Sequence, residues 1–459
     1  MNAADVLRRV LPADRVRSDA ATLRVHESDG LTLLRERPQA VVYPRSTEEV
    51  AACVRALTDA SLAVVPRGAG TGLAGGARPC CDGAVVDLAK MDRILVLDPQ
   101  ARLARVEAGV VNARVSEAAA PHGLFFAPDP SSQIACTIGG NVACGAGGPH
   151  CFRYGTMTDH VCAVTFVDAA GESHEVEDES LLSLLVGSEG TLGIVTEATL
   201  RLLPQPPCVA TLLLSFATLR EACGCVESVI SAGYVPAALE ILDKLAIAAV
   251  EDSEFRAGYP RDAAAVLLAE VEGTRAEVED AVSFFEERWP VRRAQSDEER
   301  AALWRGRKGA FGAMGRVAEE CYVVDGVVPR RAMAEALDRI RQAAEEASLP
   351  CINVFHAGDG NLHPLISYRR DQSDVVSGLG KKIAAICVEL GGSLTGEHGV
   401  GAEKRDFMPL LFDDASLSAM ERVRRAFDPK RLMNPGKVLP GPKVCAEAIL
   451  RKEATDVIG

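Results

Sequence analysis

Three of the eight histidines in this chain fall between residues 356 and 398, and the last of them follows a glutamate. The residues around 358–361 predict a four-residue turn between two strands, with His356 directly opposite His363. Opposed residues of an antiparallel pair have Cβ atoms about 5 Å apart on one face. That spacing suits two imidazoles that share a metal ion. A lone histidine is more often structural, but a cluster with an acidic neighbour is more often a site.

A further ligand candidate lies in the segment 395–401, which contains Glu397 and His398 between glycines. The segment follows a predicted helix over 376–390, which two glycines at 391 and 392 cap. Adjacent side chains of an extended segment point to opposite sides, but glycines allow a bend that brings both into one site. Two histidines and a carboxylate suit Zn²⁺, Mn²⁺ or Fe²⁺, and the sequence does not choose among these ions.

A glycine-rich stretch over 66–76 follows a short apolar run that predicts a buried strand. Glycines at 70, 72 and 75 match the dinucleotide-binding pattern, which requires a helix after its last glycine. A new strand at 84–88 leaves no room for that helix, so a Rossmann fold is disfavoured. Two interpretations stay open, a phosphate-binding loop between two strands and a glycine-rich surface turn.

Two more glycine-rich regions follow, over 128–148 and 186–196. Many small, turn-forming residues without repetition indicate backbone that wraps closely around a ligand. The alternative is an irregular loop, but long irregular loops inside compact domains are uncommon unless they are functional.

The 459 residues carry a formal net charge of -14 and are 48% hydrophobic, as in ordinary globular proteins. The negative charge argues against nucleic acid as the main partner. The 14 cysteines form no CxxC pair, which excludes a zinc-ribbon or iron–sulfur spacing. No apolar run reaches the length of a signal peptide core or a membrane span. We therefore expect a cytoplasmic protein with reduced thiols and no transmembrane segment.

The elements that position these residues fall into an α+β pattern. Ser46 and Glu49 form a capping box before an amphipathic helix, and strands and one hairpin follow up to about residue 200. A proline-rich linker at 204–207 marks a boundary. In the second half we predict strands over 209–215 and 264–272, with helices on one side of an antiparallel sheet. The predicted helices span 219–233, 239–248 and 275–288. The predicted domains are a helical N-terminal preamble (1–38), a first domain (39–205), a second domain with a C-terminal helical segment (206–440) and a tail (441–459).

The glycine-rich motifs of the first half resemble the flavin-binding motifs of the vanillyl-alcohol-oxidase type of FAD-linked oxidases, which have a two-part PCMH-type FAD-binding domain. The motifs that carry this resemblance lie at 66–72, 137–141, 154–155 and 187–195. The resemblance implies that the first loop holds the FAD pyrophosphate and that the others enclose the ribityl chain and isoalloxazine. Thr71 stands where some members have a flavin-linking histidine, so the resemblance implies non-covalent FAD. The implied FAD-binding residues are Pro66, Arg67, Gly68, Ala69, Gly70, Thr71, Gly72, Pro128, Asp129, Ser131, Thr137, Gly139, Gly140, Asn141, Gly145, Tyr154, Gly155, Glu189, Gly190, Gly193, Ile194, Val195 and Asn434.

The second half resembles the C-terminal, substrate-binding domain of FAD-linked 2-hydroxyacid dehydrogenases, a group that includes glycolate oxidases and D-lactate dehydrogenases. The motifs at 356–363, 396–399 and 434–437 carry this resemblance, which covers residues 39–440. It implies that His356, His363 and Glu397 bind a divalent metal. It also implies that His398 is the catalytic base and that Arg307 binds the substrate carboxylate.

The resemblance implies an FAD-dependent oxidation of a small (D)-2-hydroxy acid, glycolate or D-lactate, with metal assistance and hydride transfer to flavin N5. Relatives that act on 2-hydroxyglutarate carry a lysine before the Asp325-x-x-x-Pro329 string, where this chain has valines. The implied electron acceptor is a quinone, a cytochrome or an iron–sulfur partner subunit. Two assemblies are compatible with the resemblance, a homodimer and a hetero-oligomer with companion oxidase subunits. In the second case a partner could attach the protein to the inner membrane. Three rival hypotheses are a flavin-carrying partner subunit of a larger glycolate oxidase complex that only transfers electrons, an enzyme similar to D-2-hydroxyglutarate dehydrogenases, and a metallohydrolase.

Overall fold

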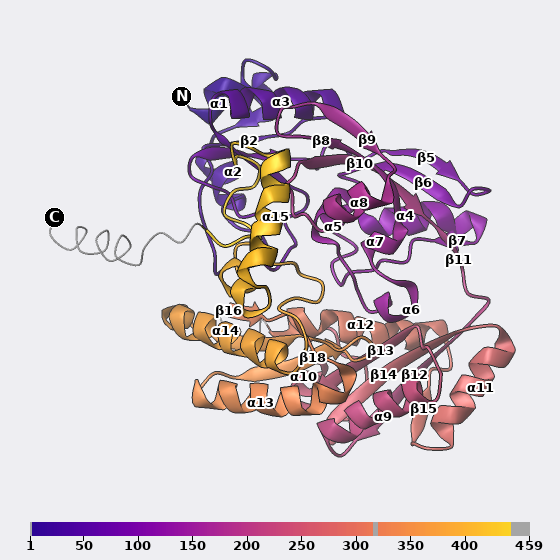
Figure 1. Ribbon diagram of the computed structural model, residues 1–459. Coiled ribbons are helices and arrows are strands. Elements are labelled where there is room, and N and C mark those ends of the chain that lie inside the picture. Colours follow the sequence, from indigo (N-terminus) through magenta and orange to yellow (C-terminus); the bar gives the residue numbers. More distant parts are fainter. Residues whose placement is uncertain (1, 315–319, 442–459) are drawn as a thin grey trace.

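The computed structural model describes residues 2–314 and 320–441 and arranges them in two parts, one above the other in Figure 1. The first part contains two larger sheets and one short two-stranded sheet, and the second contains one large sheet with helices on both faces. The tail predicted over 441–459 lies outside the described residues except for Gly441. No helix among the described residues has both the length and the apolar character needed to span a membrane.

The first sheet of the first part has the strand order β1-β2-β4-β3, and its three valine-rich strands β2, β4 and β3 run parallel. Their valines are fully buried, as expected for parallel strands covered on both faces. Helix α3 (Thr47–Asp59) packs on this sheet and begins where predicted, because the Ser46 side chain accepts a hydrogen bond from the Glu49 N–H. The strands are β1 (Val16–Arg17), β2 (Ala40–Val42), β3 (Ala63–Arg67) and β4 (Gly83–Asp87).

The glycine-rich loop connects β3 directly to β4 and contains no helix, which confirms that the fold is not of the Rossmann type. The N-terminal residues contribute more than the predicted helices. Besides α1 (Ala3–Leu7) and α2 (Ala20–Val25), they supply β1, which pairs with β2 and so belongs to the first sheet.

The second sheet is antiparallel in the order β5-β6-β10-β8-β9. Residues 137–144, predicted as part of an irregular region, instead contain helix α5 (Ile138–Cys144), which begins after Thr137. The glycines at its start allow a close approach, because a Cβ on Gly139 would lie 2.5 Å from the Ala108 side chain. The strands are β5 (Ile94–Asp98), β6 (Leu103–Glu107), β8 (Val161–Val167), β9 (Ser173–Val176) and β10 (Ile194–Arg201). The remaining elements of this part are α4 (Asn112–Ala119), α6 (Cys151–Tyr154), α7 (Met157–His160), α8 (Glu179–Leu185), and the short pair β7 (Leu124–Phe125) and β11 (Leu203–Pro204).

The second part is built on an antiparallel sheet in the order β15-β12-β14-β13-β18-β19-β17. Successive residues of its strands face two different cores, so the sheet is covered on both sides. The helices α9, α11, α13 and α14 cover one face, whereas α10 and α12 cover the other. The prediction of helices on one side was therefore wrong. The helices are α9 (Leu219–Ser231), α10 (Lys244–Glu251), α11 (Arg275–Glu286), α12 (Asp297–Ala313), α13 (Met333–Glu346) and α14 (Ser373–Glu389). The strands are β12 (Cys208–Phe216), β13 (Ala238–Asp243), β14 (Ala265–Gly273), β15 (Val291–Arg293), β16 (Glu320–Val323), β17 (Gly326–Val327), β18 (Cys351–His356), β19 (Asn361–Leu362) and β20 (Pro364–Tyr368).

The predicted helix over 239–248 is also wrong in its first half. Residues 238–243 form β13, a central strand between β14 and β18, and only α10 after it is helical. A strand that is buried on both faces has no clear alternation of apolar and polar residues, so periodicity alone does not separate this mostly apolar stretch from a helix.

The C-terminal segment returns to the first part after leaving the large sheet. Helix α15 (Asp414–Phe427) ends with Phe427, whose ring centroid lies 6.4 Å from that of Phe166 in β8. Met433 then forms a parallel bridge with Val64 in β3, and the N–H of Asn434 donates to the Val64 carbonyl at 2.7 Å. The predicted range 206–440 thus includes a segment that packs on the first part (Figure 1).

Candidate functional site

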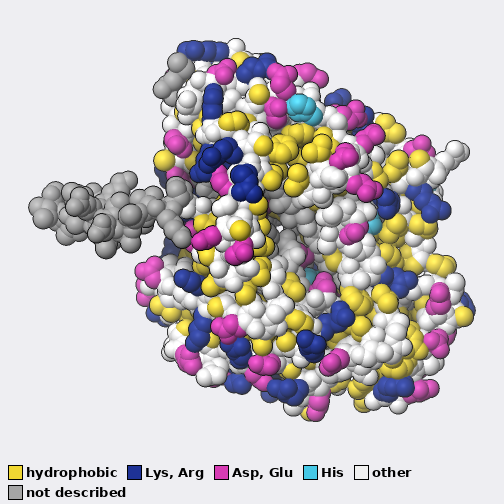
Figure 2. All heavy atoms as spheres, viewed as in Figure 1, with side chains coloured by type: hydrophobic (Ala, Val, Ile, Leu, Met, Phe, Trp, Pro, Cys, Tyr) yellow, Lys and Arg dark blue, Asp and Glu magenta, His cyan; other side chains and the backbone are white. Residues whose placement is uncertain are grey.

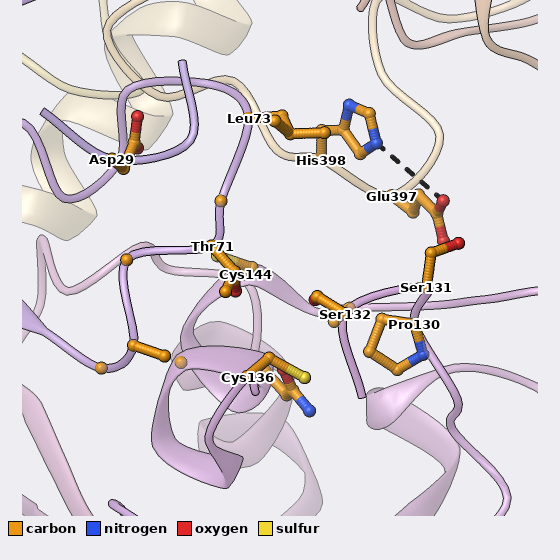
Figure 3. Close-up of a pocket in the computed structure, with 18 of the residues that line it drawn as sticks. Asp29, Thr71, Leu73, Pro130, Ser131, Ser132, Cys136, Cys144, Glu397 and His398 are labelled. Atoms are coloured by element: carbon orange, nitrogen blue, oxygen red, sulfur yellow. Dashed lines mark ion pairs between the residues drawn. The ribbon is translucent and has the colours of Figure 1, made fainter. Parts of the chain in front are cut away.

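A cavity of about 600 Å³ lies where the two parts meet, and residues of both parts line it. Its size falls in the range of cofactor and ligand sites. The surface is hollowed between the parts in Figure 2. Figure 3 shows the glycine loop with Thr71 on one side of the cavity and Glu397 with His398 on a separate loop.

Most of the residues predicted to bind FAD line this cavity. They come from the β3–β4 loop, from α5 and the residues before it, from the segment that leads into β10, and from Asn434. The exceptions are Pro128, Asp129, Gly145, Tyr154 and Gly155. Asp129 instead binds Lys308 at 3.2 Å and His150 at 2.9 Å, and the Tyr154 hydroxyl donates to Glu272 at 2.5 Å.

Two kinds of observation show that the first part fits a large polar cofactor such as FAD. The glycine loop leaves open space beside its backbone, because a Cβ on Gly72 would meet only Asp29 Oδ2, at 3.8 Å. Thr137 Oγ1, Asn141 Nδ2 and Asn434 Oδ1 are buried without a hydrogen-bond partner among the described residues, although all three residues line the cavity. Buried polar atoms are normally paired, so a bound group with polar atoms would satisfy them.

His356 and His363 come together from the hairpin around β18 and β19, but in a different register from the predicted one. His356 pairs with Asn361 rather than with His363. The observed partner of His356 lies two residues before the predicted one. Because side chains of a strand alternate with period two, a shift of two residues keeps both histidines on one face, as diagonal neighbours. Their ring centroids lie 5.1 Å apart.

Glu397 completes a three-residue group that has the ligand set of a divalent metal site. Its Oε1 lies 3.2 Å from His356 Nε2 and 3.1 Å from His363 Nε2. Ligands about 2.1 Å from a tetrahedral ion are roughly 3.4 Å apart, close to the observed spacing. Neither ring nitrogen of His363 has a hydrogen bond among the described residues. Three protein ligands at one side of an open cavity fit a catalytic metal site that keeps a position for substrate.

Glu240 of β13, which the sequence analysis did not identify, orients both His356 and Arg307. It is fully buried, and its carboxylate lies 2.8 Å from His356 Nδ1. It also accepts from Arg307 Nε at 2.6 Å and pairs with Arg307 Nη2. The contact at Nδ1 directs His356 Nε2 towards Glu397, as carboxylates do for metal-bound histidines. Burial opposes the charged ring of His356, but Glu240 and Glu397 raise the pKa of His356 well above its usual value.

Asp325, which follows β16, holds the loop that carries Glu397 and His398. Its buried carboxylate accepts hydrogen bonds from Thr395 Oγ1 at 2.5 Å and from the His398 N–H at 3.1 Å. Lys404 balances its charge at 3.1 Å. These contacts bend the loop so that Glu397 and His398, adjacent in sequence, both line the cavity, as predicted.

His398 is in a state that suits proton abstraction. Burial lowers the pKa of His398 to about 4, although Asp325 opposes that shift, so the ring is neutral near pH 7. The ring stacks on His363 with centroids 4.9 Å apart, and its Nε2 lies 4.0 Å from Glu397 (Figure 3). Burial would raise the pKa of Glu397, but His356 and His363 lower the pKa of this carboxyl well below its usual value.

Arg307 lines the cavity, as predicted, but Glu240 already occupies two of its nitrogens. Two further cations of α12, Arg305 and Lys308, also line the cavity. Lys308 pairs with Asp129, whereas Arg305 has no ion pair among the described residues. Arg305 and Lys308 are not among the predicted site residues, although both lie close to Trp304 in the same short basic stretch as Arg307.

Family comparisons match nearly the whole chain. Residues 38–177 match a family described as "FAD binding domain", and residues 205–438 match "FAD linked oxidases, C-terminal domain". The chain is 42% identical over 438 residues to the glycolate oxidase subunit GlcD of Escherichia coli K12, covering 92% of this chain and 88% of that protein. It is 36% identical over 413 residues to a D-lactate dehydrogenase of Archaeoglobus fulgidus, covering 87% of this chain and 91% of that protein.

Solved structures show the same fold at low sequence identity. The structure of p-cresol methylhydroxylase with bound substrate superposes with a TM-score of 0.79 at 16% identity and covers 95% of this chain and 96% of that chain. The 4-ethylphenol oxidase of Gulosibacter chungangensis gives a TM-score of 0.77 at 17% identity and covers 96% of this chain and 97% of that chain. Both family matches and this fold show that the chain belongs to the FAD-linked oxidases.

Proposed function

We propose that this protein is an FAD-dependent dehydrogenase that oxidises a small (D)-2-hydroxy acid, glycolate or D-lactate, to the 2-oxo acid. One observation carries the proposal. The group of His356, His363 and Glu397 and the neutral His398 reach the same cavity as the glycine-rich residues of the flavin-binding part. The names of the similar proteins, a glycolate oxidase subunit and D-lactate dehydrogenases, support this class of substrate.

The residues of the site account for each step of this reaction together with the two bound groups. When bound, FAD supplies a hydride acceptor, and a divalent ion at His356, His363 and Glu397 supplies a Lewis acid for oxygen atoms of the substrate. His398 takes the proton of the substrate hydroxyl as general base. Arg307 offers its remaining N–H groups to the substrate carboxylate. The products are the 2-oxo acid, the protonated base and the reduced cofactor.

The charge of the site favours an anion with one carboxylate. Beside the metal position, the carboxylates of Glu240 and Glu397 offset two of the three positive charges that Arg307 and a divalent ion bring together, so one positive charge remains there. Of the two other cations that line the cavity, Lys308 is paired with Asp129 and Arg305 is exposed to solvent. Val323 and Val324 stand where dicarboxylate-specific relatives carry a lysine, and Val323 lines the cavity. Both observations support glycolate or D-lactate over 2-hydroxyglutarate.

The proposal is tested by following the visible flavin absorbance under anaerobic conditions while 2-hydroxy acids are added. We expect glycolate and D-lactate to bleach the flavin, and L-lactate and D-2-hydroxyglutarate to do so far more slowly. Chelator treatment should stop the bleaching and leave the flavin spectrum unchanged. A colourless protein would contradict flavin binding, and full reduction in a metal-free preparation would contradict the metal. Acid precipitation should release the flavin, because Thr71 forms no histidyl bond.

A second proposal is that the chain works as one subunit of a larger oxidase, because three of the similar proteins are named as subunits of glycolate oxidase. The electron acceptor would then be a partner with a quinone, a cytochrome or an iron–sulfur centre. Bleaching by glycolate without turnover, with turnover restored by a soluble artificial acceptor, would support this assembly.

A further inference from the structure

Glu189 lies in the flavin-binding part, in a backbone conformation that points to a special role. Its φ is +52°, in the left-handed region that residues other than glycine rarely adopt. The surrounding backbone holds Glu189 in this conformation. The Glu189 N–H donates to the Ala143 carbonyl at 2.7 Å, and the next residue, Gly190, packs so closely that a Cβ on it would lie 2.4 Å from the Pro66 ring. Strain of this kind persists where the surroundings impose it, and it is concentrated at functional sites.

The Glu189 side chain forms hydrogen bonds with the loop that carries Glu397 and His398. Its Oε1 accepts from the Val400 N–H at 2.7 Å, and its Oε2 accepts from the Gly401 N–H at 2.8 Å. Glu189 is 6% exposed and lines the cavity. Each carboxylate oxygen of Glu189, in the flavin-binding part, therefore accepts a hydrogen bond from one backbone N–H of this loop.

Asn434 fixes the same place from a third segment. Its Nδ2 donates to the Glu189 carbonyl at 2.6 Å and to the Gly76 carbonyl at 2.9 Å. The carbonyl of Ala74 in the glycine loop accepts from the N–H groups of Ala402 and Glu403 at 3.0 and 3.1 Å. The glycine loop, the segment of Glu189 and the loop that carries Glu397 and His398 therefore meet at one point.

Two carboxylates thus hold the two ends of the loop. Asp325 binds the N–H groups at 396–398 and belongs to the second part, together with His356 and His363. Glu189 binds the N–H groups at 400–401 and belongs to the flavin-binding part. The first anchor sets the loop relative to the histidines, and the second sets it relative to the flavin side of the cavity.

We propose that Glu189 is a positioning residue that fixes Glu397 and His398 relative to the flavin-binding part. The proposal rests on the proposed function, because it assigns these two residues to metal binding and proton abstraction. Glu189 itself does not touch the reacting atoms in this scheme.

The experiment compares Glu189→Gln with Glu177→Gln, a matched control at an exposed position of the same part. Glutamine keeps the shape but places an NH₂ group against a backbone N–H, so one of the two hydrogen bonds is lost. We expect Glu189→Gln to retain FAD, to bind Mn²⁺ or Zn²⁺ roughly 10–100-fold more weakly, and to reduce its flavin more slowly by a similar factor. Glu189→Asp, which keeps the charge, should give an intermediate effect. Hydrogen–deuterium exchange should speed up in peptides that cover 396–401 in Glu189→Gln but not in Glu177→Gln.

The outcomes separate this inference from the proposed function. Unchanged exchange, metal affinity and flavin reduction in Glu189→Gln would overturn the inference, even though the wild-type protein performs the proposed reaction. Loss of FAD together with the metal would also overturn it, because Glu189 would then hold the flavin segment rather than the loop. If the wild-type protein binds no metal and reduces no flavin, the proposed function fails. Faster exchange of the 396–401 amides in Glu189→Gln would still show that Glu189 holds this loop.

Discussion

The carboxylate of Glu240 lies 2.8 Å from His356 Nδ1, on the side of the ring opposite to the proposed metal position. The same carboxylate pairs with Arg307. One buried side chain therefore orients a proposed metal ligand and the residue proposed to bind the substrate carboxylate. A change at Glu240 affects two functions of the site without removing any group that touches the substrate.

Glu240→Gln should weaken metal binding roughly 10–100-fold, the usual effect of losing the carboxylate behind a metal-bound histidine. It should also destabilise the fold, since the Arg307 charge is left buried without its partner, at a cost of about 3–5 kcal/mol. Metal titration and thermal unfolding measure the two effects. Glu254→Gln, at an exposed position, is the control and should change neither. Wild-type metal affinity in Glu240→Gln would show that His356 needs no orienting carboxylate.

Gly72→Val should abolish FAD retention while leaving the melting temperature of the FAD-free protein unchanged. A Cβ at Gly72 meets only Asp29 Oδ2, at 3.8 Å, so the protein has room for the side chain and only the cofactor would compete with it. FAD content after gel filtration and thermal unfolding of the apoprotein are the measurements. Gly224→Ala is the control, because a Cβ there meets nothing within 4 Å. Retention of FAD by Gly72→Val would place the cofactor elsewhere.

Glu397→Ala and His398→Ala should have different effects although the residues are adjacent. Glu397→Ala should lose the metal. His398→Ala should keep metal and FAD and slow flavin reduction by roughly 10²–10⁴-fold, the usual share of a general base. Anaerobic stopped-flow absorbance, paired with metal analysis of both variants, measures this. Loss of metal in His398→Ala and its retention in Glu397→Ala would reverse the two assignments.

Arg307→Gln and Arg305→Gln test which arginine holds the substrate carboxylate. We expect Arg307→Gln to raise the half-saturating glycolate concentration, by an amount equivalent to roughly 1.5–3 kcal/mol for a hydrogen bond to a charged group. Arg305, which is exposed and has no ion pair among the described residues, should affect this concentration only at low salt, as a screened charge does. A larger effect from Arg305→Gln at physiological salt would transfer the role to Arg305.

His150 should make stability depend on pH in the alkaline range. Burial opposes its charge, but Asp129 and Glu270 raise the pKa of His150 to about 10, above the value of about 6.5 expected in the unfolded chain. A raised folded-state pKa stabilises the fold fully below pH 6.5, and this contribution is lost as the pH rises towards 10. The difference in unfolding free energy between the wild type and His150→Gln should therefore shrink from pH 6 to pH 10. A difference that stays constant over that range would contradict a charged His150 in the fold.

The sequence predicted the parts of the fold that depend on local signals. Ser46 caps its helix as expected, and the absence of a helix after the glycine loop follows from the strand at 84–88, which the structure contains as β4. The hairpin histidines lie on one face despite the wrong register, because an error of two residues preserves the face. Local patterns therefore predicted which side chains share a surface.

The remaining differences have long-range causes. The mostly apolar stretch at 238–243 forms a central strand because β14 and β18 flank it, and nothing within the stretch indicates these neighbours. Glu240 lies within that stretch, so its role at His356 depends on a pairing between distant strands. Asp325 and Glu189 hold one loop from two different parts, and no spacing in the sequence brings them together.

The bridge between Val64 and Met433 has a consequence for the order in which the protein is made. Residues 66–72 leave the ribosome early in synthesis, whereas Asn434 emerges more than 350 residues later, after the whole of the large sheet. Until then the nascent chain lacks the amide that joins Gly76 to Glu189, and β3 has a free edge where Met433 will pair. The cofactor site is therefore completed only after the second part has been synthesised, and a chain that stops short of residue 434 should remain without tightly bound flavin.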